Sequence, residues 1–210
     1  GSAWVNVSNP QGLGVLGNQY NYTSFTPVTT NKLRLNITAK PNYSTGVLEW
    51  KVYGVPASSG ETDVNLALSA TPSTSYCSPW ESVDALNDGY DPAHSNDRSH
   101  LVYGNWYNPG TTQWVQYDWS SPVTIKYCKV YWFSHVVTGG GIDLPQSCSF
   151  QYWNGSQWVN VSNPQGLGVL GDQYNTTTFT PVTTTRIRLN ITAKSNYSTG
   201  ILEWQVWGTN

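Results

Sequence analysis

Apolar and polar residues alternate with the period of a β-strand along most of the chain. In the stretch QWVQYDW, residues 113–119, Val115, Tyr117 and Trp119 occupy one set of alternate positions. The stretch TRIRLNIT, residues 185–192, alternates in the same way. Successive side chains of a strand point to opposite faces of a sheet, so each pattern predicts a strand with one buried face. No window of about 11 residues carries a helical stripe, and the chain is predicted to be all-β.

Turn signals separate the alternating stretches. Residues 148–161 read CSFQYWNGSQWVNV, in which two alternating runs flank Asn154-Gly155. This dipeptide suits the positive backbone dihedrals of a type I′ turn and predicts a β-hairpin. Clusters of proline and glycine interrupt the rest of the chain, at Pro79, Pro92, Pro109-Gly110, Gly139 to Gly141 and Pro145. Short strands joined by such turns predict an antiparallel β-sandwich or jelly roll.

One phrase occurs twice in the sequence. WVNVSNPQGLGVLGNQYN begins at Trp4, and WVNVSNPQGLGVLGDQYN begins at Trp158. The correspondence joins residues 1–54 to residues 155–208 at a constant offset of 154 residues, with 11 differences in 54 positions. The sequence is therefore interpreted as three parts. They are a partial repeat at 1–54, corresponding to the C-terminal third of a preceding module, a linker at 55–61, and a complete module at 62–210.

The partial repeat raises a question of stability. The complete module is long enough to bury a core by itself, whereas residues 1–54 hold only some strands of a sandwich and would leave open edges. Because they nearly duplicate residues 155–208, they could take the same place against residues 62–154. Two outcomes stay open: strand exchange, which gives a domain-swapped homodimer or an open oligomer, and a poorly ordered overhang.

Composition and charge exclude several classes of function. The chain is 38% hydrophobic and 10% charged, with a net charge of −2, so it can form a core and lacks the basic field that binds nucleic acid. No stretch approaches about 18 to 20 apolar residues, and membrane insertion is not expected. Three cysteines, Cys77, Cys128 and Cys148, cannot all pair within one chain. Buried free thiols are favoured over a bridge between Cys128 and Cys148.

Motifs of common enzyme classes are absent. The chain has no G-x-S-x-G and no H-E-x-x-H, and TGGGID, residues 138–143, lacks the lysine and the helix of a phosphate-binding loop. The histidines, His94, His100 and His135, have no spacing that suggests a triad or a metal triplet. The protein is predicted not to be an enzyme.

The stretch from Ser78 to Trp119 points to sugar binding. It gathers Trp80, Tyr90, Tyr103, Trp106 and Tyr107 among many Pro, Gly, Asn and Asp residues, which is typical of loops. Exposed aromatic rings pack on the C–H face of a sugar, while amide, carboxylate and basic groups pair with its hydroxyls. Other tryptophans are expected to be ordinary core, namely Trp114, Trp119, Trp153, Trp158 and Trp204.

Several segments in order carry a family resemblance. NLALSATPSTSYCSPWESVDALNDG, QWVQYDWSSPVTIKYCKVYWF, LPQSCSFQYWNGSQWVNV, FTPVTTTRIRLNI and GILEWQVWG together resemble a discoidin, or coagulation factor V/VIII type C, module of the galactose-binding-like superfamily. The module is similar to the family 32-like carbohydrate-binding modules of secreted bacterial glycoside hydrolases. The resemblance implies a jelly-roll sandwich that binds glycans without catalysis.

The resemblance also implies a structural calcium ion. The aspartate of the matching DG motif is Asp88, flanked by the carbonyls of Ala85 and Tyr90, and the terminal glutamate is Glu203, beside the Leu202 carbonyl. Ser95 is placed less directly as a hydroxyl ligand, because the loop YDPAHSN is longer than usual. An unpaired glutamate in an apolar strand independently favours a cation, with a salt bridge as the alternative.

The sugar-binding residues implied by the resemblance lie in four loop segments, SPWES, HSNDRSH, GNWYN and SHVVTGGGID. The candidates are Trp80, Glu81, Asp97, Arg98, Asn105, Trp106 and His135. The expected protein is a secreted binding module that holds a glycoside hydrolase on an arabinose- or galactose-containing plant polysaccharide. The alternative is a cell-surface adhesion module that binds a host glycan or a protein.

Overall fold

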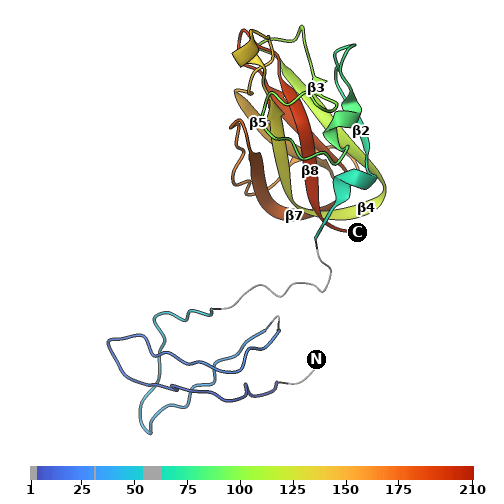
Figure 1. Ribbon diagram of the computed structural model, residues 1–210. Coiled ribbons are helices and arrows are strands. Elements are labelled where there is room, and N and C mark those ends of the chain that lie inside the picture. The colour runs from blue at the N-terminus through green and yellow to red at the C-terminus, as the bar shows by residue number, and fades with distance from the viewer. Residues whose placement is uncertain (1–3, 31, 54–62) are drawn as a thin grey trace. The chain divides into compact units, whose positions relative to one another are not determined.

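The computed structural model describes residues 4–30, 32–53 and 63–210. The chain divides into two compact units, Gly1–Gly60 and Glu61–Asn210 (Figure 1). The predicted linker, residues 55–61, lies outside the described residues. Within the described part of the chain, no helix is long and apolar enough to cross a membrane.

Every strand of the described chain belongs to the second unit, and the prediction of an all-β antiparallel sandwich is confirmed. The strands are β1 (Val64–Asn65), β2 (Thr71–Thr74), β3 (Tyr103–Gly104), β4 (Thr112–Phe133), β5 (Ser147–Trp153), β6 (Trp158–Asn160), β7 (Tyr174–Thr192) and β8 (Gly200–Thr209). Three short 3₁₀ turns accompany them: η1 (Leu66–Ser69), η2 (Val83–Leu86) and η3 (Val136–Thr138).

Two long strands run through both layers of the sandwich. The first part of β4, up to Asp118, pairs with β2 and with the C-terminal half of β7. From Val123 onward β4 pairs with β8 and with the N-terminal half of β7. The register shifts between these two parts, and the intervening residues 120–122 are exposed. Such an irregularity bends a strand, so β4 leaves one layer and enters the other.

The core lies between the two layers. Val115, Tyr117 and Trp119 are all buried, as their alternation predicts. The Tyr117 ring stacks on Trp204 of β8 with centroids 4.3 Å apart. The Tyr117 hydroxyl donates hydrogen bonds to the carbonyls of Leu86 and Trp204, so its polar atom is satisfied inside the core.

The hairpin formed by β5 and β6 confirms one expectation and corrects another. Trp153 pairs with Trp158, so the connecting loop has four residues, 154–157, and a two-residue type I′ turn is wrong. The Asn154 side chain accepts hydrogen bonds from the backbone N–H groups of Ser156 and Gln157, which closes the loop locally. Only Gly155 has a positive φ there, of 100°.

Three tryptophans expected in the core are only partly buried: Trp114, Trp153 and Trp158. The Arg188 guanidinium lies 4.2 Å from the centroid of Trp114 and 4.1 Å from that of Trp158. Cation–π contact therefore covers these rings on the outer face of the sheet. Trp119 and Trp204 are buried, as expected.

Strand β8 runs from the loops at one end of the sandwich to the ends of the module at the other. At its start Gly200 pairs with Gly104 of β3, and at its finish Trp207 pairs with Asn65 of β1. A small apolar cluster under the loops contains Val102, Tyr131, Phe133, Ile142 and Leu202, with Trp106 packed against it. This cluster gives the loops a rigid base.

The first unit, in its described residues 4–30 and 32–53, contains one isolated bridge between Gln11 and Ser24 and no strand. Its apolar side chains are mostly exposed; Trp50, for example, has 49% of its surface accessible. The repeated sequence therefore forms strands β6, β7 and β8 of the sandwich in one copy and, in the described residues of the other copy, one isolated bridge.

Candidate functional site

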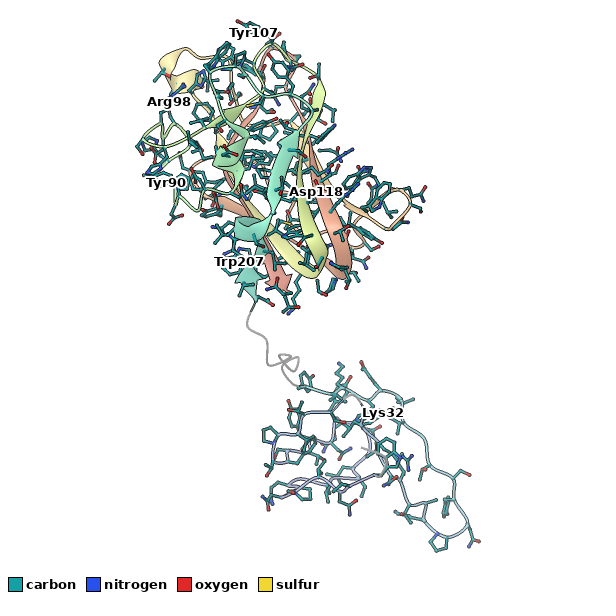
Figure 2. The ribbon with its side chains drawn as sticks, turned by 90° about the vertical axis from the view of Figure 1, so that its right-hand side faces the viewer. Lys32, Tyr90, Arg98, Tyr107, Asp118 and Trp207 are labelled. Carbon is teal, nitrogen blue, oxygen red and sulfur yellow. The ribbon has the colours of Figure 1, made fainter. Side chains whose placement is uncertain are left out.

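A cleft of about 430 Å³ opens among the loops of the second unit. Its lining residues are Pro79, Trp80, Glu81, Ser82, Arg98, His100, Leu101 and Val102. Arg98 and Tyr107 lie at the end of the sandwich opposite Trp207 (Figure 2). Three of the predicted sugar-binding residues, Trp80, Glu81 and Arg98, therefore meet at one cleft.

An aromatic cluster extends this cleft to one side. Trp80 has 54% of its surface exposed, and its ring meets the edges of Trp106 and Tyr107 with centroids 6.3 Å and 5.9 Å apart. Trp106 in turn stacks on His135 at 5.4 Å. Trp106 and His135 thus hold the exposed indole of Trp80 rather than line the cleft themselves. Tyr107 has a positive φ of 69°, which is uncommon outside glycine and concentrates at functional loops.

The glycine run of the TGGGID segment makes this stacking possible. A Cβ atom on Gly140 would lie 1.2 Å from Cδ2 of His135, and one on Gly141 would lie 2.7 Å from Cζ3 of Trp106. No side chain fits at either position without displacing a ring. The glycines therefore serve close packing of the aromatic cluster, a role that the sequence pattern did not show.

Glu81 is the buried acid of the cleft. Both of its carboxylate oxygens are inaccessible and have no hydrogen-bond partner, and the nearby Ser78 hydroxyl donates to the Gly104 carbonyl at 2.8 Å. Burial raises the pKa of Glu81, while Ser78 and the Arg98 guanidinium act in the opposite direction. A Cβ on Gly104 would overlap Oε2 of Glu81, so this glycine allows the carboxylate its position. Buried carboxylate oxygens without a partner are costly, so a hydrogen-bond donor that reached them from the cleft would stabilise Glu81.

Two basic side chains, Arg98 and His135, lie near the cleft. The Arg98 guanidinium lies 5.4 Å from the centroid of Phe133, under the loops. His135 is buried, and its Nδ1 atom has no partner. Burial and the charge of Arg98 lower the pKa of His135, which keeps the imidazole neutral at physiological pH. Arg98 is therefore the cation of this site.

Two predicted binding residues, Asp97 and Asn105, make hydrogen bonds within the protein. The Asp97 carboxylate accepts hydrogen bonds from the backbone N–H groups of Ala93 and Ser99 and from the hydroxyls of Tyr90 and Ser99. The Ser99 bonds, with the other two, hold the pKa of Asp97 far below its usual range. Asn105 exchanges two hydrogen bonds with Thr199, at 2.8 Å each. Both side chains thus position the loops.

Glu203 is a second unpaired acid, on β8. It is fully buried, and neither carboxylate oxygen has a hydrogen-bond partner. Burial and the nearby negative charges of Asp88 and Asp91 raise its pKa to about 8, against a weaker opposing effect of the Gly89 N–H. A buried carboxylate without a partner is costly, and a cation would neutralise it.

The surroundings of Glu203 fit a hard cation with oxygen ligands. Asp88 is exposed and accepts a hydrogen bond from the Tyr90 N–H. Ala85, three residues before Asp88, and Leu202, directly before Glu203, are both buried. The described residues contain no group of three His, Cys, Asp or Glu side chains arranged as ligands. Backbone carbonyls would therefore have to supply several ligands, as they do for calcium.

Ser95 lies in a different contact from the one expected. Its hydroxyl accepts a hydrogen bond from the Asp172 N–H, and its own N–H donates to the Asp172 carboxylate, both at 2.7 Å. These bonds tie the long YDPAHSN loop to the turn before β7. The structure instead brings Asp91 near Glu203, and no motif singles out Asp91 among the loop carboxylates.

Known structures share this fold. A chain of the Streptococcus pneumoniae β-galactosidase BgaA aligns with 65% of this chain and 90% of its own length, at 18% identity and a TM-score of 0.58. The family 32 carbohydrate-binding module of C. perfringens NanJ, solved with galactose, aligns over 70% and 99%, at 13% identity and a TM-score of 0.55. A chitosan-binding module of a Paenibacillus chitosanase/glucanase, solved with chitotriose, aligns over 69% and 100%, at 20% identity and a TM-score of 0.51.

No protein-family model matches the chain. The structural similarity shows that the second unit has the same β-sandwich fold as these structures. At these identities it establishes the fold alone, and the ligand has to be argued from the residues of the cleft.

Proposed function

We propose that the second unit is a non-catalytic carbohydrate-binding module and that its ligand binds at the cleft of Trp80, Glu81 and Arg98. The observation that carries this proposal is an exposed indole, held edge-on by Trp106 and Tyr107, beside an unpaired carboxylate and a guanidinium. The galactose- and chitotriose-bound neighbours support a sugar as the ligand class.

Each side chain of the cleft has a distinct part in binding. The Trp80 ring offers an apolar face on which the C–H groups of a sugar ring pack. Glu81 accepts hydrogen bonds from sugar hydroxyls, and Arg98 donates them. Asp97, Asn105, Trp106 and His135 keep these three groups in place. A cleft with an aromatic wall and few polar groups is typical of small-ligand sites.

The wider role follows from this binding. The module belongs, on this proposal, to a secreted enzyme that degrades polysaccharide, and it holds that enzyme on an arabinose- or galactose-containing plant polymer. Further copies of the module in the same protein would add avidity. A calcium ion held by Glu203, Asp88 and the carbonyls of Ala85, Tyr90 and Leu202 would neutralise the acid on β8 and fix the loop before β3.

Affinity electrophoresis of the whole chain tests the proposal. We expect gels containing arabinan or galactan to retard the protein, with arabinoxylan, mannan and chitosan as the alternative polymers. Trp80→Ala is expected to lower the affinity about 10-fold or more, which removes about 1.4 kcal/mol or more of binding free energy. The matched control is Trp4→Ala, because Trp4 is also 54% exposed but lies in the first unit.

The outcomes separate the candidate functions. Retardation that is lost with Trp80→Ala and kept with Trp4→Ala supports the cleft. If both variants are still retarded, the sugar binds elsewhere on the chain. Absence of retardation by every polymer favours the adhesion alternative, in which the loops contact a host glycan or a protein.

A further inference from the structure

Strands β6, β7 and β8 rest on a seat formed by the rest of the module. We propose that residues 4–53 can occupy this seat in place of residues 158–207 of the same chain, which gives a circularly permuted sandwich. In that state the chain order would be residues 4–53, then the linker, then residues 63–157. Residues 158–210 would be released.

The repeat matches its twin where the seat is tightest. Between residues 158 and 207, 17 side chains or backbone positions are buried, and 15 of them carry the same residue type in the repeat. The exceptions are Leu33 for Ile187 and Val47 for Ile201. Both are apolar exchanges of similar volume, which cores tolerate best. The other eight differences between residues 4–53 and 158–207 fall at exposed or half-buried positions.

The sheet brings the two ends of the module together, which makes the permuted connection short. Trp207 pairs with Asn65, so an exchanged Tyr53, the twin of Trp207, would lie one strand spacing from Asn65. Paired residues of antiparallel strands are about 5 Å apart. The 12 peptide bonds from Tyr53 to Asn65 reach up to about 40 Å, so the linker spans the gap easily.

The other junction also permits the exchange. The native chain passes from β5 to β6 through residues 154–157, which are all exposed. After exchange Trp4 would pair with Trp153, as Trp158 does now, and the released segment would leave from this loop. Exposed loops are the places where chain ends are tolerated in permuted proteins.

The repeat keeps the local structure that docking needs. Gln11 and Ser24 exchange backbone hydrogen bonds of 2.8 and 3.0 Å, and their twins Gln165 and Thr178 do so at the same distances. The Arg34 guanidinium lies 3.9 Å from the Trp4 centroid, which reproduces the contact of Arg188 with Trp158. Apolar burial supplies the driving force, because six exposed residues of the repeat have buried twins: Leu35, Ile37, Val47, Leu48, Trp50 and Val52.

The two copies are expected to compete closely. Replacing a buried Ile by Val disfavours a fold about 2- to 13-fold in its equilibrium constant, so Val47 in place of Ile201 favours the present state by that factor. From this difference alone, about 7% to 33% of chains would hold the repeat in the seat after refolding. Trp80, Glu81 and Arg98 precede residue 158, so the sugar cleft survives the exchange, and Glu49 takes the place of Glu203.

A disulfide bond between residues 52 and 128 would detect the exchange. Cys128 on β4 is buried and pairs in register with Val206 of β8, whose twin is Val52. Paired positions of antiparallel strands lie within the Cα range of a disulfide. The full chain with Val52→Cys, Cys77→Ser and Cys148→Ser is unfolded in urea and refolded with an oxidant. Peptide mass spectrometry then quantifies the link between residues 52 and 128.

Matched variants show how much of the 52–128 disulfide is specific. Val206→Cys in the same background traps the present state and shows that Cys128 can be bridged. Lys51→Cys reports random linking, because Lys51 is next to Val52 and successive residues of a strand face opposite sides of the sheet. Trp204→Ala is expected to raise the 52–128 link severalfold, since it weakens only the native occupant, and Trp50→Ala is expected to abolish it.

The expected result is a monomeric chain with the 52–128 link in excess of the Lys51→Cys background. The proposal is overturned if that link stays at background while the Val206→Cys link forms. A link found only in dimers by light scattering also overturns it, because the seat would then belong to a second copy. A Trp204→Ala chain that unfolds without gaining the link counts against it as well.

Discussion

Residues 4–53 and 158–207 have nearly the same sequence and share their local structure. Asn9 and its twin Asn163 both have a φ of 54°. The Leu16 N–H donates to the Asn21 side chain at 2.9 Å, and Leu170 donates to Asn175 at the same distance. These contacts join residues close in sequence. Short-range geometry is therefore set by the residues of the repeat, whatever surrounds them.

Their long-range structure differs completely. Trp204 is fully buried between the layers, whereas its twin Trp50 is 49% exposed; Leu189 is fully buried, and Leu35 is 49% exposed. The partners of Trp204 and Leu189 come from β4 and β5, which only the second unit contains. The difference shows that strand pairing here depends on a partner strand rather than on the propensity of the segment.

Damage to the shared seat should have the largest effect. Tyr117→Ala removes the ring that stacks on Trp204 and the hydroxyl that donates to two buried carbonyls. We expect the free energy of unfolding to fall by about 3 to 5 kcal/mol in urea titrations followed by tryptophan fluorescence. The control is Tyr53→Ala in the first unit, where the side chain is 73% exposed and the change should stay within about 0.5 kcal/mol. Equal losses in the two variants would refute the contrast between the units.

Glu203 and its twin Glu49 should differ in how they affect the pH dependence of stability. Glu203 has a folded pKa of about 8 against an ordinary value of 4.5, so the folded state binds the proton more tightly. Without a metal, the free energy of unfolding should therefore fall by about 1.4 kcal/mol per pH unit as the pH rises between these two values. Glu203→Gln is expected to remove this slope, and Glu49→Gln to leave it unchanged.

Calcium gives the same comparison a second test. Thermal unfolding with a chelator and with added calcium measures the stabilisation by calcium, because binding to the folded state raises the melting temperature. We expect calcium to stabilise the chain above pH 7 and Glu203→Gln to abolish that gain. A gain that persists in the variant would place the cation elsewhere.

The smallest effect should come from making the copies more alike. Ile201→Val converts a buried residue of β8 into that of its twin, Val47. We expect the module to lose about 0.5 to 1.5 kcal/mol of stability, measured by urea unfolding. Val47→Ile serves as the matched control, and a loss of the same size there would show that Val47 is itself packed in a core.

Alternation and turn residues were sufficient to predict the sandwich, because a strand with one buried face leaves a period of two. They failed where a residue's partner is far away in sequence. Asn105 looks like a free amide, yet its partner Thr199 lies 94 positions later. Trp114 looks like core, yet Arg188 covers it from another strand.

Three of the predicted binding residues line one cleft, and their role in binding stays a prediction. Trp80, Glu81 and Arg98 were identified through the resemblance, which fixes where loops end up on the fold. The glycine run at 139–141 lacks the lysine of a phosphate-binding loop. Its role in packing the aromatic cluster depends on where His135 and Trp106 lie. Composition alone does not reveal such a spatial fit.

Strand β8 also determines how the module is oriented on whatever carries it. Its ten residues extend about 33 Å, from Gly200 beside the loop end to Thr209 beside β1, where the module's chain enters and leaves. The proposed ligand cleft and the two ends of the module thus lie at opposite poles. On the proposed function, the cleft therefore faces away from the pole at which the chain enters the module.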